Sequence, residues 1–251
     1  MTLTVHQFQC LEDNYGYLVR DMASGRVAAI DTPDADAYAA ELDRLGWGLD
    51  LILNTHWHPD HAGGNTALKA RYGAEVCAPA EVEKTSPVDR LLSEGDTVAL
   101  GETLFRVIDT GGHTAEHISL YDAADGVAFV GDTLFTLGCG RMFEGTPTQF
   151  WGSLSELAAL PDATVVYCAH EYTASNLRFA ESVDNGEALA ARAPTLRARI
   201  AAKQPTVPTT VGEEKATNPF LRAPYLPIAG GAPDPAEAFR IVRAAKDGFR
   251  G

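Results

Sequence analysis

Four side chains of types that bind metal ions fall within six positions of this sequence. They stand in the string T-H-W-H-P-D-H of residues 55–61 and are His56, His58, Asp60 and His61. Imidazole and carboxylate ligands together suit zinc, and also iron or manganese. Residues two apart in an extended chain point to the same side, so His56 and His58 should converge while Trp57 points away. Pro59 favours an extended backbone at His58, which agrees with this geometry. A single histidine here would more often be structural, but four such residues favour a metal site.

The neighbouring residues place this group at the end of a strand. Residues 49–54 form a short apolar run of strand length. After Gly63 and Gly64, residues 65–72 have the pattern of a helix. The group is therefore expected on a loop just past a strand, a position where α/β sheets often carry their chemistry.

Three further side chains of ligand type also follow predicted strands. His113 comes after a strand that ends at Ile108, Asp132 after one that ends at Val130, and His170 after residues 163–168. Two other histidines are better explained as structural residues, His117 at the start of a strand and His6 on a surface strand. Asp31 ends a strand, where a contact to a ligand histidine and an ordinary turn are both open interpretations.

The composition fits a globular protein. The chain has 251 residues, 45% of them hydrophobic, which allows one large domain or one domain with an appendage. A run of about 18 apolar residues is absent, so we expect no membrane span. Residues 1–6 lack the features of a secretory signal. The four cysteines include no C-x-x-C pair, which favours reduced thiols and a cytoplasmic location.

Charge is distributed unevenly along the chain. The formal net charge is −14, made up of −17 over residues 1–171 and +3 over residues 172–251. The acidic first part argues against nucleic acid as a partner. The basic second part could bind a small anionic ligand, although solvated helix faces explain most such arginines. We expect a monomer that acts on a small molecule.

The pattern of strands and helices predicts two parts. Strands alternate with turns over most of residues 1–171, and helices dominate residues 172–251 around a proline-rich passage at 205–235. Strands are predicted at residues 4–10, 17–20, 26–31, 49–54, 97–100, 103–108, 117–121, 127–131 and 163–168. Helices are predicted at residues 35–45, with Asp34 as N-cap, and at 65–72, 148–160, 172–183, 187–203 and 235–247. We expect a catalytic domain at residues 1–171 and a helical substrate-binding domain at 172–251.

The H-x-H-x-D-H motif resembles the signature of the metallo-β-lactamase fold superfamily. This resemblance implies an α/β fold, an αββα sandwich with a C-terminal helical domain, and two divalent metal ions, zinc or else iron or manganese. The implied ligands are His56, His58 and His113 for the first ion, Asp60, His61 and His170 for the second, and Asp132 as a bridge. Asp60 and Asp132 are the implied catalytic carboxylates. A bridging water close to neutral pKa would then hydrolyse an acyl bond without a protein nucleophile.

Four further stretches narrow the resemblance to the glyoxalase II family, the hydroxyacylglutathione hydrolases. They are residues 11–18, 137–146, 170–180, and 217–222 taken with 243–247. The family implies hydrolysis of S-D-lactoylglutathione to D-lactate and glutathione, the second step of methylglyoxal detoxification. Its glutathione contacts match Arg141, Tyr172, Arg243 and Lys246. Two positions depart from the family pattern: Phe143 replaces a tyrosine, which removes one hydrogen bond, and Trp57 stands where histidine is frequent.

Two alternative functions stay open from the sequence. A glutathione persulfide dioxygenase of the same fold shares the histidine motif and a Gly-Cys-Gly-Arg-like loop, but it holds a single iron. The stretch 172–180 and the pair Arg243 and Lys246 favour the hydrolase instead. A glutathione-conjugate binding protein without activity is disfavoured, because all seven ligand types are present.

Overall fold

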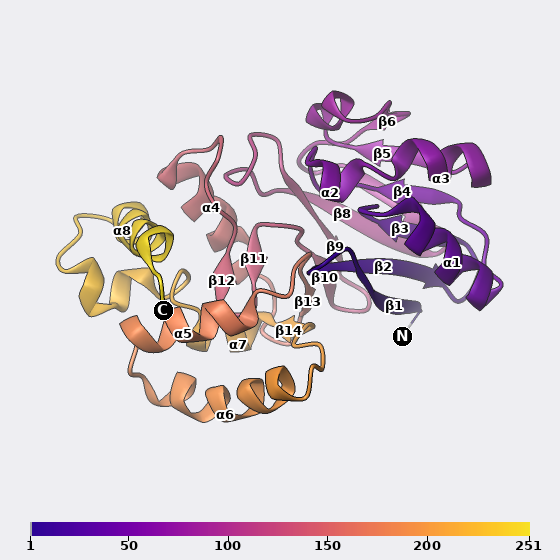
Figure 1. The fold of residues 1–251 in the computed structure, drawn as a ribbon. Helices are drawn as coiled ribbons and strands as arrows, with labels where there is room; N and C mark the ends of the chain where they lie inside the picture. Colours follow the sequence, from indigo (N-terminus) through magenta and orange to yellow (C-terminus); the bar gives the residue numbers. More distant parts are fainter. Residues whose placement is uncertain (1) are drawn as a thin grey trace. The chain divides into compact units, whose positions relative to one another are not determined.

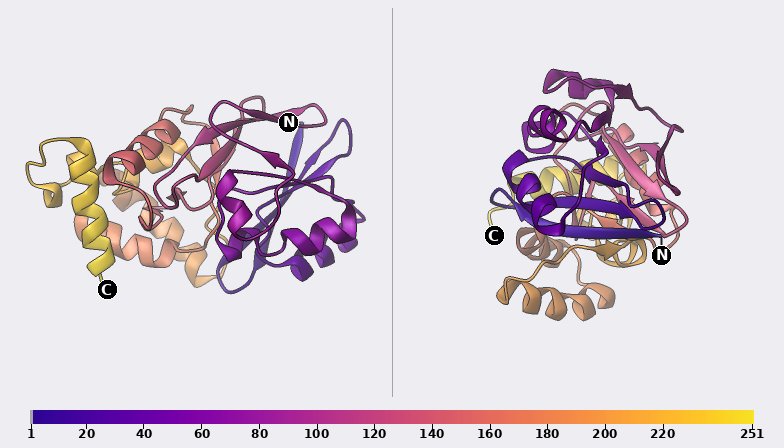
Figure 2. Two further views of the ribbon diagram at one scale, coloured as in Figure 1. Left: turned by 90° about the horizontal axis from the view of Figure 1, so that it is seen from above. Right: turned by 90° about the vertical axis from the view of Figure 1, so that its right-hand side faces the viewer.

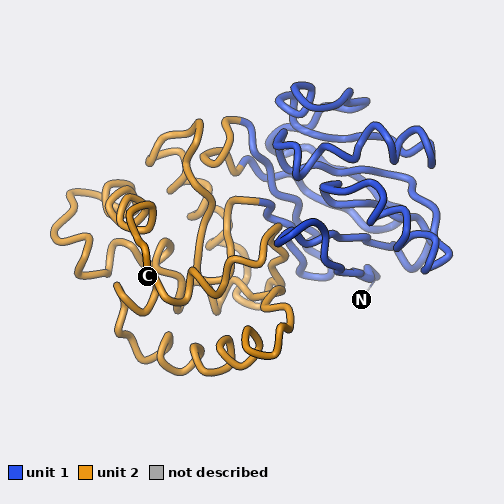
Figure 3. Tube along the Cα trace, in the orientation of Figure 1, with its two compact units in different colours: residues 1–109, 116–131 blue, residues 110–115, 132–251 orange. Residues whose placement is uncertain are grey.

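The computed structural model describes residues 2–251, which divide into two compact units (Figure 3). Unit 1 comprises residues 1–109 and 116–131, and unit 2 comprises residues 110–115 and 132–251. Met1 lies outside the described residues. It is the first residue of the segment 1–6, which was predicted to lack a secretory signal. None of the helices in residues 2–251 has the length and apolar character needed to cross a membrane.

Unit 1 contains a mixed six-stranded sheet with the order β1-β2-β3-β4-β5-β6 (Figure 1). Its strands are β1 (Leu3–Cys10), β2 (Asn14–Asp21), β3 (Val27–Ile30), β4 (Leu51–Leu53), β5 (Glu75–Ala78) and β6 (Arg90–Leu91). Strands β1 to β3 pair antiparallel, whereas β3 to β6 pair parallel. Ile30 is opposite Leu53, so the residues that follow β3 and β4 emerge at the same edge of the sheet.

Helices pack on one face of this sheet. They are α1 (Ala35–Leu45) and α3 (Asn65–Tyr72). Two shorter elements lie in the connections between strands: α2 (Pro59–Ala62) between β4 and β5, and the 3-10 helix η1 (Ala80–Lys84) between β5 and β6. Asp34 caps α1 as predicted, accepting bonds from the backbone of residues 36 and 37, and Gly46 ends it at φ 66°. Tyr38, Leu42 and Leu68 of the helices share one buried cluster with the sheet residue Ile52. Because the apolar face of α1 packs on the sheet, the position of the chain that runs from α1 into β4 is determined.

A second antiparallel sheet lies on the other face of the first. In unit 1 it contains β7 (Thr97–Leu100), β8 (Thr103–Asp109), β9 (Ile118–Asp122) and β10 (Val127–Phe129). The rings of Tyr17 and Phe129 meet edge to face at 5.6 Å and join the two sheets. The right-hand view of Figure 2 shows the helices and the two sheets as successive layers of this unit.

Unit 2 is mainly helical. Its helices are α4 (Pro147–Ala158), α5 (Thr173–Val183), α6 (Glu187–Ala201), α7 (Val211–Thr217) and α8 (Pro235–Gly248), with the 3-10 helices η2 (Ala223–Tyr225) and η3 (Pro227–Ala229). Its strands are β11 (Leu134–Phe135), β12 (Gly138–Cys139), β13 (Val165–Tyr167) and β14 (Thr209–Thr210). Leu137, in the turn between β11 and β12, is buried against Leu177 of α5 and Leu189 of α6. This short hairpin thus shares its core with the C-terminal helices.

The predicted strands and helices agree with the structure within a few residues. The predicted helix 35–45 and strand 97–100 have the observed bounds of α1 and β7. The short elements that were not predicted are α2, β5, β6, β11, β12, β14, α7 and the 3-10 helices η1, η2 and η3. The β5–β6 pair and the β11–β12 hairpin are held by contacts distant in sequence, so a local pattern gives little signal for them. The mixed sheets with helices confirm the α/β class, whereas the domain boundary at residue 171 stays a prediction.

Candidate metal centre

The chain leaves β4 in an extended conformation that turns two histidine rings toward each other. His58 has φ −56° and ψ 143°, as expected before Pro59. His56 Nε2 lies 3.0 Å from His58 Nδ1. The ring of Trp57 packs instead among apolar side chains that include Ala62 and Val82. The alternation predicted for an extended segment is therefore present.

Asp60 and His61 are on the short helix α2. Gly64, just after this helix, lies against the backbone of Thr32. A Cβ at position 64 would lie 2.7 Å from the Thr32 carbonyl oxygen, so a larger residue would not fit there. His61 is 1% exposed, and its Nε2 lies 3.8 Å from Oδ2 of Asp60. The helix therefore presents a carboxylate and an imidazole side by side.

Asp31 orients His61 from the end of β3. Its carboxylate accepts bonds from the Thr55 backbone N–H at 2.8 Å, the Thr55 hydroxyl at 2.9 Å and His61 Nδ1 at 2.8 Å. Asp31 has φ 54°, a left-handed conformation that is unusual for a non-glycine residue. The His61 Nδ1–H donates to the carboxylate, which puts the lone pair of the ring on Nε2. Of the two interpretations of Asp31, the structure supports a contact to a ligand-type histidine.

We expect Asp31→Asn to weaken metal binding about 10–100-fold while the fold persists. The amide keeps the size of the side chain and one acceptor for Thr55. Its NH2 group would face His61 Nδ1 and favour the tautomer that carries the proton on Nε2. Chelator competition on the purified protein measures the metal affinity, and Asp36→Asn on α1 is the matched control. Equal affinities of Asp31→Asn and the wild type would contradict this role.

In unit 2, Asp132 lies between two histidines. Its Oδ2 is 3.3 Å from Nε2 of His113, and its Oδ1 is 3.3 Å from Nε2 of His170. His113 Nδ1 lies 2.8 Å from the carbonyl oxygen of Arg141, which assigns the proton to Nδ1 and the lone pair to Nε2. Asp132 is 6% exposed and His170 is 3% exposed. The Asp132 carboxylate therefore places one oxygen beside each of the two histidines.

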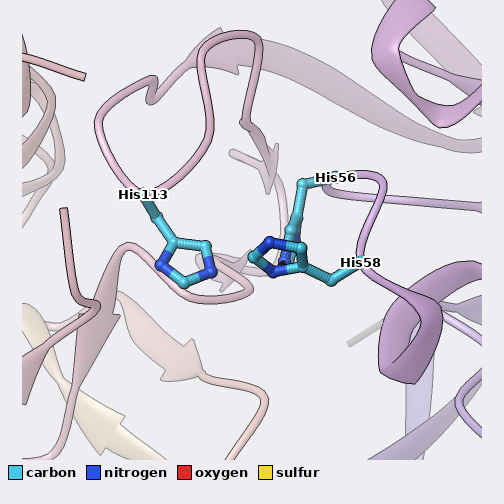
Figure 4. A group of neighbouring side chains, drawn as sticks. All are labelled: His56, His58 and His113. Carbon is cyan, nitrogen blue, oxygen red and sulfur yellow. Dashed lines mark hydrogen bonds between the residues drawn. The ribbon is translucent and has the colours of Figure 1, made fainter. Parts of the chain in front are cut away.

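The seven predicted ligands form three groups within residues 2–251. The ligand atoms of each group lie within 4.8 Å of one another, and the groups are His56, His58 and His113 (Figure 4); His56, His61 and Asp132; and Asp60, His61 and His170. Imidazole and carboxylate donors in such groups fit divalent metal ions. His6 and His117 are outside all three groups. His6 bonds to Glu41 at 2.8 Å, and His117 is buried with its ring 4.9 Å from that of His56.

Asn14 was not predicted as a site residue. Its amide nitrogen lies 3.1 Å from the backbone oxygen of Asp60 and 3.3 Å from Oδ2 of the same residue. The side chain is 5% exposed. Asn14 therefore restrains the carboxylate that the family resemblance assigns as a ligand. The only signal in the sequence was its presence in the stretch 11–18, to which no role was attached.

Two aromatic rings of unit 2 flank the histidines on either side of Asp132. The Tyr172 ring stacks on His170 at 4.7 Å with 4° between the planes. The Phe143 ring meets His113 edge to face at 5.3 Å. Both are exposed, Phe143 to 62% and Tyr172 to 38%. Exposed rings beside the histidines provide an apolar surface that a substrate could contact.

The predicted cationic pair on α8 divides into one buried and one half-buried side chain. Arg243 is 5% exposed and donates to the carbonyl oxygens of Cys139 at 3.0 Å and Gly140 at 3.4 Å. Lys246 Nζ donates to the carbonyl and the hydroxyl of Ser175 at 3.0 and 2.8 Å. Burial, together with the nearby Arg243 guanidinium, lowers the pKa of Lys246 to about 8. Arg243 therefore supports the loop that leads to Arg141, and Lys246 is the cation closer to solvent.

Two family profiles match consecutive parts of the chain. The metallo-β-lactamase superfamily profile matches residues 14–170, and the profile for the hydroxyacylglutathione hydrolase C-terminus matches residues 171–249. Together the two profiles cover all seven predicted metal ligands and the C-terminal helical segment.

Relatives and solved structures agree with these matches. A hydroxyacylglutathione hydrolase of Erythrobacter litoralis is 52% identical over 250 residues, covering 98% of this chain and 100% of the relative. The structure of ETHE1 from Myxococcus xanthus superposes with a TM-score of 0.71 at 27% identity, covering 96% of this chain and 90% of that one. TTHA1623 in a di-iron-bound form gives a TM-score of 0.64 at 25% identity, with coverages of 87% and 100%.

Proposed function

Since the chain belongs to the hydroxyacylglutathione hydrolase family of the metallo-β-lactamase superfamily, we propose that it hydrolyses S-D-lactoylglutathione to D-lactate and glutathione, the second step of methylglyoxal detoxification. The family resemblance and the metallo-β-lactamase fold predicted from the motifs are confirmed. The observation that carries the substrate is the second profile match over residues 171–249, because the superfamily alone includes several chemistries.

We propose that two divalent ions occupy the centre, with zinc favoured and iron or manganese as alternatives. The proposed ligands are His56, His58 and His113 for one ion, and Asp60, His61 and His170 for the other. Asp132 would bridge. The proximity of the ligand atoms in these groups supports this assignment, as does the di-iron state of TTHA1623. Such ions, when bound, lower the pKa of a bound water toward neutrality and stabilise negative charge on the thioester oxygen.

The side chains of the protein orient this chemistry. Asp132 is proposed as the carboxylate that keeps both halves of the centre at a fixed spacing, and Asp60 as the second catalytic carboxylate, restrained by Asn14. The leaving group is a thiolate, whose conjugate acid has a pKa of about 8.5, like that of a cysteine thiol. It can depart without a proton from the enzyme, so the reaction requires no separate general acid.

We further propose that unit 2 binds the glutathione part of the substrate. Arg141 and Tyr172 would contact the tripeptide, and Phe143 would contribute an apolar face in place of a hydroxyl. Lys246 would attract the glycine carboxylate, and Arg243 would hold the loop that leads to Arg141. The net charge of +3 on residues 172–251, within a chain of −14, supports an anionic ligand there.

The affinity for substrate is expected to depend on the charge of Lys246. A charge-assisted contact to a carboxylate remote from the thioester contributes about 1–3 kcal/mol to ground state and transition state alike. Lys246→Ala should therefore raise KM about tenfold at pH 7 and change kcat by less than a few-fold. The lowered pKa of Lys246, about 8, predicts that the wild-type KM rises as pH increases through 8 and the ammonium loses its proton.

Steady-state kinetics from pH 6.5 to 9 measures this dependence, with the uncatalysed loss of thioester subtracted at each pH. Lys246→Arg is the matched control, because it keeps its charge across this range and should remove the rise in KM. An unchanged KM in Lys246→Ala would mean that the ammonium serves only the bonds to Ser175.

The remaining proposals concern organisation and location. We propose that residues 1–171 form the catalytic domain and residues 172–251 the substrate-binding domain, and that the protein is a monomer. All four cysteines are buried, and burial raises the pKa of the Cys139 thiol to about 11. Protonated, buried thiols and a glutathione substrate agree with a reducing compartment, so we propose that the protein works in the cytoplasm.

The test is an assay of S-D-lactoylglutathione hydrolysis on purified protein of known metal content. We expect thioester loss, release of one thiol per thioester cleaved, and about two metal ions per chain. One iron per chain with oxygen uptake on glutathione persulfide would favour the dioxygenase instead. Full metal occupancy without activity on either compound would contradict the proposed function.

A further inference from the structure

The β11–β12 hairpin connects Asp132 to Arg141 and contains a constrained turn. Leu137 has φ 57°, in the left-handed region, which is unfavourable for a residue other than glycine. Strands of two residues each form the hairpin. Neither feature is stable alone, so other parts of the chain must hold this conformation.

Two side chains on successive turns of α7 hold the hairpin. Glu214 accepts the Leu137 backbone N–H through Oε2 at 2.9 Å. Asn218, the residue that ends α7, shares the two protons of Nδ2 among three acceptors, the carbonyl oxygens of Phe135 at 3.1 Å and Gly138 at 2.9 Å and Glu214 Oε2 at 2.9 Å. Both side chains are 0% exposed. Glu214 and Asn218 thus bond three backbone groups of the hairpin, while the Thr136 carbonyl accepts from Asn176 of α5 at 3.1 Å.

The buried carboxylate has partners on its other side too. Glu214 Oε1 accepts from Arg192 of α6 at 2.7 Å and from the hydroxyl of Thr209 at 2.7 Å. Each oxygen therefore has two donors. A buried charge adds little stability over an apolar residue even when it is paired, so stability alone does not account for Glu214. Its directional bonds fix the backbone of one turn.

The hairpin in turn fixes the residues at its two ends. At Gly140 a Cβ would lie 2.1 Å from the carbonyl oxygen of Asp132, so the two ends of the hairpin are in close backbone contact. The carbonyl oxygen of Arg141, the next residue, lies 2.8 Å from His113 Nδ1. A shift of the turn would therefore move Asp132 and rotate the ring of His113 together.

We propose that Glu214 and Asn218 are positioning residues that set Asp132 and His113 for metal binding. Neither side chain contacts the reacting groups, and both act through the hairpin. This role rests on the proposed function, because it assigns a task within that centre. It also predicts properties of the protein without substrate, so its failure can be distinguished from failure of the activity.

The test uses Glu214→Gln and Asn218→Ser, with Glu213→Gln as the matched control on the same helix. The glutamine cannot accept from all four donors around Glu214, and the serine cannot reach both hairpin carbonyls. Glu213 has a side chain that is 53% exposed; it bonds Thr210 at the start of α7 and lies 3.2 Å from the Thr209 hydroxyl and 3.8 Å from Arg192, and glutamine keeps an acceptor for these donors. Two variants are made so that the result does not depend on one of them folding.

Three measurements are made on each protein: the visible absorption spectrum of the cobalt(II) form, cobalt affinity by chelator competition, and kcat with KM. Both variants should change the cobalt spectrum, bind cobalt about 10–100-fold more weakly and lose about 10–100-fold in kcat, with KM within about threefold. The Glu213→Gln control should resemble the wild type. A wild-type cobalt spectrum and affinity in Glu214→Gln and Asn218→Ser would overturn the proposal, even if their melting temperatures fall. If the wild type itself proves inactive on the thioester, the cobalt measurements still decide.

Discussion

Asp132→Ala is expected to abolish hydrolysis of S-D-lactoylglutathione, with a loss of about a thousandfold or more in kcat. The carboxylate offers one oxygen to the side of His113 and one to the side of His170, each at 3.3 Å. Alanine would remove a ligand from both proposed ions at once and leave their mutual repulsion without a bridging anion. The variant should therefore contain less metal than His113→Ala, which removes a ligand from one ion only.

Elemental analysis of zinc, iron and manganese in both variants, purified in parallel, measures this difference. Asp162→Ala is a suitable control, because that carboxylate is exposed and pairs with Lys215 away from the ligand groups. Asp132→Asn tests the charge alone and should retain more metal than alanine, because its amide oxygen can still bind one ion. Equal metal loss in Asp132→Ala and His113→Ala would contradict the bridging position.

The sequence was most informative where local chemistry determines the backbone. Asp34 and Gly46 predicted the bounds of α1, because capping and left-handed residues act within one helical turn. Pro59 predicted the extended backbone at His58, and the two-residue spacing predicted the converging rings of His56 and His58. The location of ligand-type residues after strands predicted that they gather. The metallo-β-lactamase fold followed from the motif and is confirmed.

The sequence was least informative where partners are distant along the chain. Leu137, in a left-handed conformation, donates its backbone N–H to Glu214, 77 positions later, and no local pattern indicates such a bond. Arg243 and Lys246 were predicted together, as a cationic pair that contacts glutathione, but the sequence did not indicate that Arg243 is buried and donates to the carbonyl of Cys139. Helix α7 had a local signal that was overlooked. Thr210 and Glu213 form a capping box, which the surrounding prolines obscured.

A chain that ends at residue 171 is expected to be insoluble, or to lose nearly all binding of glutathione thioesters. The helices after residue 171 do more than attract substrate. They complete the core around Leu137, with Leu177 of α5 and Leu189 of α6. They also provide the buried bonds from Glu214 and Asn218, and the bond from Arg243 to Cys139.

Removal of these helices would leave the hairpin with an exposed apolar face and with unpaired backbone groups, each costing about 1–3 kcal/mol. A typical domain is stable by only about 5–15 kcal/mol, so the loss of this many contacts should unfold the segment after Asp132. Asp132 and His113 would then lose their fixed positions along with the proposed contacts to substrate.

Soluble yield, circular dichroism and metal content of the truncated chain measure the structural loss. Co-expression of residues 172–251 as a separate fragment is the control, and it should restore part of the metal binding if packing is the cause. A soluble truncated protein with the KM of the full chain would contradict both the packing argument and the assignment of residues 172–251 to substrate binding. A soluble protein that keeps its metal but has a much higher KM would retain the binding role, and it would show that the hairpin folds without α7.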